Sequence, residues 1–229
     1  MEYKKRKNCR LCGSKKLRKV IDLNKIPIGE SLHNYKSTAD KEKKYPLTVS
    51  ICRDCKHVQT LDVVDTSKLW IQYTYLSGQT PAIVKHFKEF SNFVTKKYKF
   101  INNNLVIDVG SNDGTLLKQF KKFNCSILGI DPSKNVSKIA NKNGIKTITD
   151  FINKKLVKKI VKENGKAKLI TAFNVFAHSD NMKDMLIKND GSIQSIEGIP
   201  QMIRDRYKTA WEIGNKALKV YFLLLIINL

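Results

Sequence analysis

The stretch from Val106 to Gly114, VIDVGSNDG, decides the fold expected for the second part of the chain. Three β-prone residues surround an aspartate and favour a β-strand, and the glycine-rich polar turn GSNDG ends that strand. The TLLKQF that follows has the pattern of a helix. A strand that passes through such a turn into a helix is typical of small-molecule sites in α/β domains.

The alternation of strands and helices extends on both sides of this stretch. We expect a helix at 81–98, because Ile83, Phe87, Phe90 and Val94 fall on one helical face. The other predicted elements are strands at 105–109, 126–131, 146–149 and 167–173, with helices between them at 115–123, 133–143 and 151–163. Apolar strands in this alternation predict an α/β fold with a doubly wound, parallel, Rossmann-like sheet that binds its ligand at the carboxyl ends of the strands.

The turn favours S-adenosylmethionine (SAM) over a dinucleotide. Dinucleotide folds use G-x-G-x-x-G, whereas this turn runs G-x3-G from Gly110 to Gly114. Ser111 and Asn112 stand where a pyrophosphate needs bare backbone. SAM carries no phosphate. Asp108 would favour the cationic amino group of its methionine end. We therefore predict that Asp108, Gly110, Asn112 and Gly114 bind the cofactor.

Further cofactor contacts are expected where the second and third strands end. Asp131 is placed to accept hydrogen bonds from both ribose hydroxyls, a device that NAD-binding folds also use. Asp150 and Phe151 would lie near the adenine amine and the adenine face. Two alternatives stay open: Asp131 as a turn residue before Pro132, and Asp150 as the N-cap of the next helix.

Four of the five cysteines form two pairs, CRLC (Cys9 and Cys12) and CRDC (Cys52 and Cys55), separated by 39 residues. Two thiolates in each of two tight turns complete a tetrahedral four-sulfur site, the usual arrangement for structural zinc. In a reducing cytosol such cysteines are metal ligands more often than disulfides. We predict a zinc ion that holds together a small N-terminal lobe, with a strand at 45–52.

The net charge of +23 does not by itself indicate a nucleic-acid partner. Only six of the 43 basic residues are arginine, the usual base reader, and the lysines are scattered along the chain. No signal peptide opens the sequence, and the apolar run at 220–229 is too short to span a bilayer. We expect a cytoplasmic protein without a membrane partner, and the sequence leaves its oligomeric state open.

Six motifs, taken together, resemble a known family. In chain order they are CRLCGS, ICRDCKHVQ, YTYLSGQTPAIVKHF, VIDVGSNDGTLL, GIDPSKNVSKIANKNGI and FNVFAHSDNM. Residues 9 to about 186 thereby resemble the zinc-containing sugar C-methyltransferases, which are class I SAM-dependent enzymes. The resemblance implies a zinc-binding lobe at 1–78 and an incomplete SAM-binding domain at 79–186. It also implies methyl transfer to a carbon next to the keto group of a nucleotide-linked deoxysugar.

The resemblance also implies catalytic residues, because a carbon becomes nucleophilic only after the proton α to the carbonyl is removed. Two residues could serve as the base or as the oxyanion donor: Tyr75, expected at the junction of the lobe and the domain, and His178, expected after the fourth strand. Asn174 would help to position SAM or the substrate. The alternatives are a Tyr75 that merely packs between the lobes and a His178 that is only a loop residue.

The end of the chain follows a different pattern. Residues 187–218 resemble a segment of the ribonucleotide reductase large subunit, with an amphipathic helix as the alternative. We expect 187–229 to be a foreign, helical segment with an unselected apolar tail, and the sheet edge after the fourth strand to lack its neighbours. On this interpretation the chain is a truncated or fused product without turnover. A zinc-ribbon module that binds nucleic acid or protein, with a vestigial nucleotide fold, is the competing function.

Overall fold

The computed structural model describes residues 3–28, 41–65, 69–71, 73–175, 178–180 and 226–227. These residues fall into two compact units that divide between Leu69 and Trp70, and residues 226–227 belong to the second unit. The segment 70–78, which the prediction placed in the zinc-binding lobe, is therefore part of the second unit. Within the described ranges, no helix is both long enough and apolar enough to cross a membrane.

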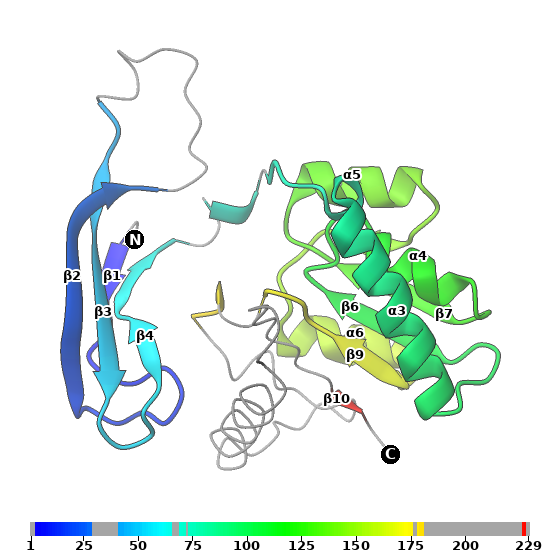
Figure 1. Cartoon of the computed structure of the whole chain (residues 1–229), viewed down its shortest axis with the longest axis horizontal. Helices are drawn as coiled ribbons and strands as arrows, with labels where there is room; N and C mark the ends of the chain where they lie inside the picture. The colour runs from blue at the N-terminus through cyan, green and yellow to red at the C-terminus, as the bar shows by residue number, and fades with distance from the viewer. Residues whose placement is uncertain are drawn as a thin grey trace. The chain divides into compact units, whose positions relative to one another are not determined.

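The N-terminal unit consists of antiparallel strands (Figure 1). One sheet has the order β2-β3-β4, and a second pairs β1 with β5. Their bounds are β1 (Tyr3–Lys5), β2 (Leu17–Pro27), β3 (Lys44–Cys52), β4 (Val58–Thr60) and β5 (Asp62–Val64). Only β3 was predicted from the sequence, because β1, β4 and β5 have three residues each and β2 carries no clean alternation.

The side-chain alternation of β3 directs one cysteine toward the interior of this unit. Thr48, Ser50 and Cys52 are buried, whereas the residues between them are partly exposed. The carboxylate of Asp62 then ties three strands together, since it accepts hydrogen bonds from the Tyr3 hydroxyl at 2.7 Å and from the Thr48 backbone N–H at 2.9 Å. These bonds hold β1, β3 and β5 in register around the cysteines.

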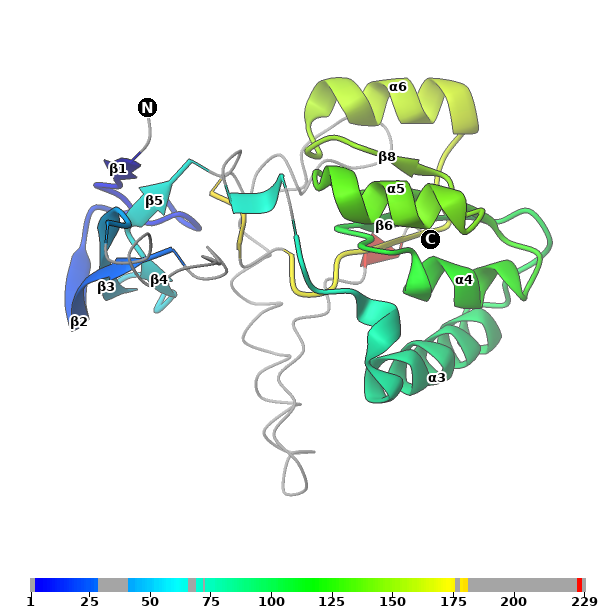
Figure 2. The same cartoon turned by 90° about the horizontal axis from the view of Figure 1, so that it is seen from above.

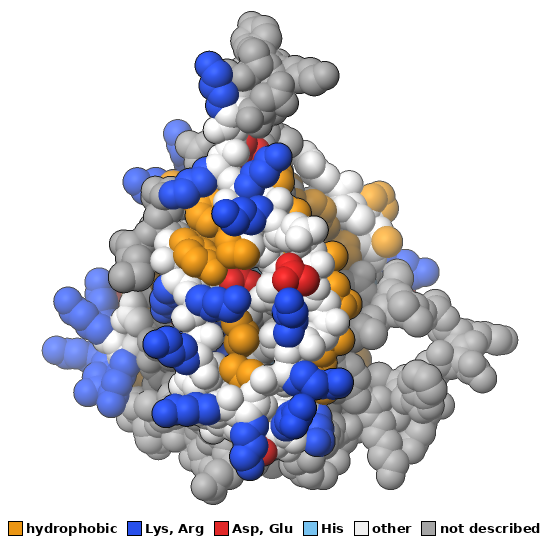
Figure 3. Space-filling model, turned by 90° about the vertical axis from the view of Figure 1, so that its left-hand side faces the viewer, with side chains coloured by type: hydrophobic (Ala, Val, Ile, Leu, Met, Phe, Trp, Pro, Cys, Tyr) orange, Lys and Arg blue, Asp and Glu red, His pale blue; other side chains and the backbone are white. Residues whose placement is uncertain are grey.

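Strand β2 is exposed along almost its whole length. Two register shifts interrupt its pairing with β3, and Asn24 adopts a left-handed φ of 58° beside one of them. Such irregularities twist an edge strand and discourage pairing with other chains. The apolar side chains on β2 lie among lysines and arginines, and acidic groups are few on the face drawn in Figure 3.

The second unit is an α/β domain whose sheet has the order β10-β9-β6-β7-β8. Strands β6 to β9 pair parallel with one another, as predicted, and β10 pairs antiparallel with β9. The strand bounds are β6 (Leu105–Val109), β7 (Ser126–Ile130), β8 (Thr147–Ile148), β9 (Leu169–Thr171) and β10 (Ile226–Ile227). The helices are η1 (Ser77–Gln79), α3 (Pro81–Lys97), α4 (Thr115–Lys121), α5 (Lys134–Lys142) and α6 (Lys154–Asn164), and they confirm the predicted α-helices to within a few residues.

Both faces of this sheet are covered by helices, which makes it doubly wound. Successive residues of β6 point to opposite faces: Val106 packs with α3 and α4, and Ile107 packs with α6. Figure 2 shows α6 on one side of the sheet and α3 with α4 on the other. The predicted apolar face of α3 is confirmed, because Phe87 and Val94 are buried and Ile83 and Phe90 pack against the same cluster.

The chain order creates a switch point in the sheet. From β6 the chain moves to β7 and β8 on one side and then returns to β9 on the other side of β6. The connections at the carboxyl ends of β6 and β9 therefore leave in opposite directions, and ligands of doubly wound sheets bind at such a point. The turn GSNDG follows β6 at this position.

The sheet edge next to β9 differs from the expectation. Ile226 and Ile227, in the apolar tail that was expected to be unselected, pair antiparallel with Ile170 and Leu169 as β10. The expectation that the edge lacks a neighbour is therefore wrong, because a bare strand edge offers N–H and C=O groups that another extended segment can bond. The segment 187–218, predicted to be helical, lies outside the described residues.

We expect replacement of Phe120 by alanine to destabilise the second unit by about 3–5 kcal/mol, the usual cost of truncating a buried aromatic residue. Phe120 is fully buried, with its ring centroid 6.2 Å from that of Phe90 and 6.3 Å from that of Phe100. The matched control is Phe93→Ala on the exposed side of α3, which should change stability by no more than about 0.5 kcal/mol. Urea denaturation followed by circular dichroism measures both variants, and equal losses would contradict the packing described.

Candidate functional site

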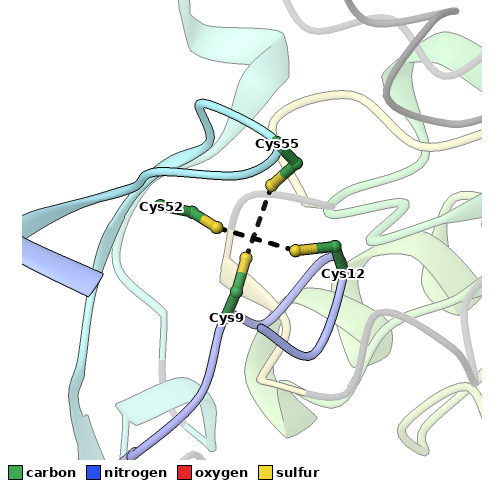
Figure 4. Close-up of side chains that lie close together, drawn as sticks. All are labelled: Cys9, Cys12, Cys52 and Cys55. Atoms are coloured by element: carbon green, nitrogen blue, oxygen red, sulfur yellow. Dashed lines mark hydrogen bonds between the residues drawn. The ribbon is translucent and has the colours of Figure 1, made fainter. Parts of the chain in front are cut away.

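The four paired cysteines converge at one point of the N-terminal unit (Figure 4). Their sulfur atoms all lie within 4.8 Å of one another, and the Cys9–Cys55 and Cys12–Cys52 pairs are 3.6 Å apart. A tetrahedral zinc ion with Zn–S bonds of about 2.3 Å requires sulfur atoms about 3.8 Å apart. The separations fit such an ion and are far too long for disulfide bonds, whose sulfurs lie about 2.05 Å apart.

Two turns of the same geometry present these sulfurs. The N–H of Gly13 bonds to the carbonyl of Cys9 at 3.0 Å, and the N–H of Lys56 bonds to the carbonyl of Cys52 at 2.9 Å. Gly13 and Lys56 occupy equivalent positions, four residues after the first cysteine of each pair, and both have a left-handed φ, of 77° and 63°. Glycine adopts this conformation without strain in the first turn, and Lys56 adopts the same conformation in the second.

A glutamine that sequence reasoning did not single out orients the cluster. The side-chain amide of Gln59, on β4, donates to the sulfur of Cys9 at 3.0 Å, and its oxygen accepts the N–H of Arg10 at 2.8 Å. Gln59 is buried, so both contacts are shielded from water. A hydrogen bond of this kind stabilises a thiolate and fixes its direction, as outer contacts commonly do for metal ligands.

The pKa shifts of these thiols indicate that four thiolates at this site require a bound cation. Burial raises the pKa of Cys55 far above its ordinary value, and the three other sulfurs act in the same direction. Burial also acts against ionisation of Cys52, but backbone N–H groups of Cys55 and Asp54 outweigh it and lower the pKa of Cys52 to about 7. Four thiols this close cannot all ionise unless a positive ion compensates them, which a bound divalent metal does.

At the switch point of the second unit, Asp108 of β6 is buried against Thr171 of β9. The Thr171 hydroxyl donates to the Asp108 carboxylate at 2.6 Å, and the two residues are paired in the sheet register. Burial raises the pKa of Asp108 to about 7; the Thr171 hydrogen bond opposes this shift, and the negative charge of Asp131 adds to it. The structure thus brings two predicted cofactor residues, Asp108 and Asp131, within electrostatic reach of each other.

The carboxylate of Asp131 joins two turns. One oxygen accepts the backbone N–H of Asn112 at 2.8 Å, and the other accepts the backbone N–H of Ser133 at 2.9 Å. Burial raises the pKa of Asp131, and these two N–H groups oppose the shift. Because each carboxylate oxygen can accept two hydrogen bonds, Asp131 keeps acceptor capacity for a ligand.

The glycines of the turn have different surroundings. Gly110 has a φ of 70°, and a Cβ there would collide with Val175. Gly114 has a φ of 79°, is buried and lies against Ile145. Glycine is therefore required at Gly110 both by the backbone and by the close approach of the segment after β9. The same two constraints hold at Gly114, where the φ is also left-handed and a Cβ would lie 2.8 Å from Ile145.

The other predicted cofactor residues that follow strands are less closely associated with Asp108 and Asp131. Asp150, Phe151 and Asn174 are exposed, and within the described residues no hydrogen bond joins them to Asp108 or Asp131. The alternative that Asp150 caps the following helix is wrong, because Asn153 is the N-cap of α6 and accepts the N–H of Leu156 at 2.9 Å. Asp150 instead accepts the N–H of Phe151 at 2.7 Å.

Tyr75 and His178 are linked through a row of aromatic rings. The Trp70 centroid lies 5.2 Å from that of His178 and 5.6 Å from that of Tyr73, and the Tyr73 centroid lies 6.4 Å from that of Tyr75. The atoms packed around the imidazole desolvate it and lower the pKa of His178. This shift favours the neutral imidazole, the form that can accept a proton. Trp70 and Tyr73 were not among the predicted site residues.

Family models match both units. Residues 9–70 match the family described as "Putative zinc binding domain", and residues 84–189 match the family described as "Methyltransferase domain". The chain therefore combines a zinc-binding domain with a SAM-dependent methyltransferase domain. This result confirms the predicted resemblance and the two predicted cofactors, SAM and zinc.

Relatives with curated descriptions are of two kinds. "C-methyltransferase NovU" of Streptomyces niveus is 26% identical over 178 residues, which cover 78% of this chain and 42% of NovU. This chain thus spans less than half the length of that relative. The "Ribonucleoside-diphosphate reductase large subunit" of Caenorhabditis elegans is 55% identical over 38 residues, which cover 17% of this chain and 5% of the reductase. The predicted resemblance to a short reductase segment is confirmed.

Solved structures show only distant likeness. A Methanococcus maripaludis protein described as a "putative s-adenosyl-l-methionine-dependent methyltransferase" is 15% identical, with a TM-score of 0.36, and the match covers 64% of this chain and 86% of that protein. The plantazolicin methyltransferase BpumL, solved with SAH, is 14% identical, with a TM-score of 0.29, and the match covers 54% of this chain and 62% of BpumL. These scores are too low to support a conclusion about this chain.

We expect freshly purified protein to contain about one zinc ion per chain, and Cys52→Ser to lose most of it, because three thiolates leave the tetrahedral site open. Elemental analysis after dialysis measures the metal content. The matched control is Cys125→Ser in the other unit, buried and remote in sequence from the cluster, which should leave the zinc content unchanged. Metal-free wild-type protein with an ordered N-terminal unit would contradict the site.

We expect the Asp108 carboxyl to make the unfolding free energy depend on pH. Its pKa is raised to about 7 in the folded chain, against about 3.9 for an unfolded aspartate. The native state binds the proton more tightly, so this stabilisation is complete below about pH 4 and is lost as the pH rises through about 7, by up to about 4 kcal/mol.

Asp108→Asn, which mimics the protonated acid, should therefore gain stability relative to wild type between pH 5 and pH 8. Urea denaturation of both proteins across this range measures the difference. A constant difference over the whole range would show that Asp108 does not titrate there.

Proposed function

We propose that this chain binds SAM and takes part in methylation of a carbon next to the keto group of a nucleotide-linked deoxysugar. The observation that carries the proposal is the joining, in one chain, of a four-cysteine unit to a methyltransferase domain, with 78% of the chain similar to a protein described as a C-methyltransferase. A methyltransferase domain alone would leave the acceptor undefined.

The residues at the switch point suit a ligand with a cationic amino group and a ribose. Asp108 is a buried carboxylate with one neutral hydrogen-bond donor, Thr171, so a cation beside it would offset the burial of its charge. Asp131 keeps free lone pairs for hydroxyl donors. SAM, when bound, supplies an electrophilic methyl group to this edge of the sheet.

We further propose that His178 and Tyr75 act on the acceptor. A neutral imidazole in the aromatic row is placed to remove a proton α to a carbonyl, and a tyrosine hydroxyl is suited to donate to the resulting enolate oxygen. The Tyr75 hydroxyl lies 3.2 Å from that of Thr80, which fixes its direction. The aromatic surfaces of Trp70 and Tyr73 between them would pack against a sugar or a base.

The charge of the chain suits an anionic acceptor. The net charge is +23, and lysines are spread over the helices and strands of both units. A positive field attracts a nucleoside diphosphate group and raises its rate of encounter. The alternative, a zinc-containing module that binds nucleic acid, would show itself as salt-sensitive binding of DNA or RNA by a chain with no affinity for SAM.

We expect SAM and its demethylated product to bind to the purified chain and NAD to bind much less tightly, as measured by calorimetric titration. Asp131→Ala should weaken SAM binding at least about tenfold, since a hydrogen bond to a charged group contributes roughly 1.5–3 kcal/mol. Asp113→Ala, which alters the same turn without touching Asp131, is the control for general disturbance of the loop. If NAD binds as well as SAM does, the interpretation of the turn is wrong.

The acceptor class is tested by incubating the chain with labelled SAM and a panel of nucleotide-linked 4-keto-deoxysugars. The proposal expects label in a carbon–methyl group of one sugar, in contrast to the expectation from the sequence of a chain without turnover. Replacement of His178 by alanine should abolish the label. Tyr75→Phe should also lower transfer, whereas Tyr98→Phe, at the end of α3, should not. Transfer of label to oxygen or nitrogen of the acceptor would contradict the proposed chemistry.

A further inference from the structure

A short segment before α3 crosses the loops at the switch point. We name residues 73–78 the strap. It ends within η1, which leads into α3. One end of the strap is held by the turn after β6. The Asn112 side-chain oxygen accepts the N–H of Ser77 at 3.0 Å, and its amide nitrogen donates to the carbonyl of Tyr75 at 2.9 Å.

The neighbouring aspartate adds a second contact at this end. One oxygen of Asp113 accepts the N–H of Gly78 at 2.8 Å. Gly78 has no room for a side chain here, because a Cβ would lie 2.8 Å from that same oxygen. The side chains of two successive residues of the turn, Asn112 and Asp113, therefore bond to the strap backbone between Tyr75 and Gly78.

The other end of the strap is held by the turn after β7. The N–H of Tyr73 contacts the Ser133 hydroxyl at 3.0 Å and the Asn135 side-chain oxygen at 3.1 Å, and the Asn135 amide donates to the carbonyl of Tyr73 at 2.6 Å. The N–H of Lys134 bonds to the carbonyl of Ile71 at 3.1 Å. The strap thus spans the carboxyl ends of two adjacent parallel strands.

Asp131 connects the two anchoring turns. Its carboxylate bonds to the backbone N–H of Asn112 in one turn and of Ser133 in the other. The distance between the anchors of the strap is therefore set by the same carboxylate that is proposed to hold the ribose. A ligand that bonds to Asp131 rigidifies both turns, and the Asn112 amide passes that constraint to the strap.

We propose that Asn112 is a positioning residue that couples binding of the methyl donor to the placement of the strap, and with it of Tyr75. The inference rests on the proposed function and adds a role for a residue that was predicted only as a direct cofactor contact. Asn112 is buried, and both polar atoms of its side chain are engaged by the strap. Its link to the donor site runs through its backbone N–H.

The substitution Asn112→Gly isolates this role. Asn112 has a left-handed φ of 52°, which glycine adopts without strain, and glycine keeps the backbone N–H that bonds to Asp131. Only the two contacts of the Asn112 side chain with the strap are lost, and the Asp113 contact with Gly78 remains. The matched control is Asn124→Gly, at an exposed asparagine with a φ of 53° in the connection between α4 and β7, where the same backbone change does not contact the strap.

Hydrogen exchange with and without SAH, the demethylated product of SAM, tests the coupling without requiring turnover. In wild type and in Asn124→Gly, SAH should slow exchange of the Ser77 and Gly78 amides at least about tenfold. In Asn112→Gly, SAH should bind within about threefold of the wild-type affinity, by calorimetry, yet should not slow exchange of the Gly78 amide, whose acceptor Asp113 is retained. A loss of strap protection with retained affinity is not expected from a residue that merely contacts the cofactor.

Three results would count against the proposal, and each has a different meaning. Equal protection of the strap in Asn112→Gly and wild type would overturn the coupling while leaving SAM binding intact. Failure of the wild-type chain to bind SAH at all would contradict the proposed function and the coupling with it. An affinity loss in Asn112→Gly of a hundredfold or more would instead identify Asn112 as a direct cofactor contact and overturn the positioning role.

Discussion

The Asp131 carboxylate is the contact on which the proposed donor site depends. It bonds to one backbone N–H in the turn after β6 and to another in the turn after β7, so that two loops from neighbouring strands are held as one surface. The strap is anchored to the same two loops. A change at Asp131 is therefore expected to alter the loops, the strap and the position of Tyr75 together.

This arrangement places two carboxyl groups, those of Asp108 and Asp131, in a buried part of the α/β domain. Asp108 and Asp131 are both less than a tenth exposed, and burial raises the pKa of each. Two such carboxylates destabilise the empty domain at neutral pH, and a ligand that brings a positive charge relieves that cost. The cysteine cluster follows the same principle, since four neighbouring thiols require a cation. Each unit is thus built around acidic groups that a positive partner satisfies.

Much of the α/β domain could be predicted from the sequence, because its strands are apolar, its helices are amphipathic and its turns contain glycine. The spacing of the cysteines likewise predicts the cluster. The short strands β1, β4 and β5 could not be predicted, because three residues carry no periodic signal. Gln59 and Thr171 were also missed, because their roles arise from partners 50 and 63 residues away in the sequence.

The sequence predicts Asn112 and Asp150 as cofactor contacts because each follows a strand. The structure adds the hydrogen bonds around these two positions, which the sequence does not predict. The Asn112 side chain bonds to a segment 35 to 37 residues earlier, which no motif in the turn predicts. The capping role considered for Asp150 belongs to Asn153, three residues later. The apolar tail pairs with β9 through Ile226 and Ile227, because an open sheet edge binds whichever extended segment reaches it.

The most direct test of the charge compensation at the donor site is the number of protons released when SAM binds. Calorimetric titrations at pH 7 in buffers of different ionisation enthalpy give this number. Because the pKa of Asp108 is about 7 in the empty domain, a cation that binds beside it should release about half a proton per chain. Asp108→Asn should abolish most of that release. The same proton release from Asp108→Asn and wild type, or none from wild type, would contradict the account.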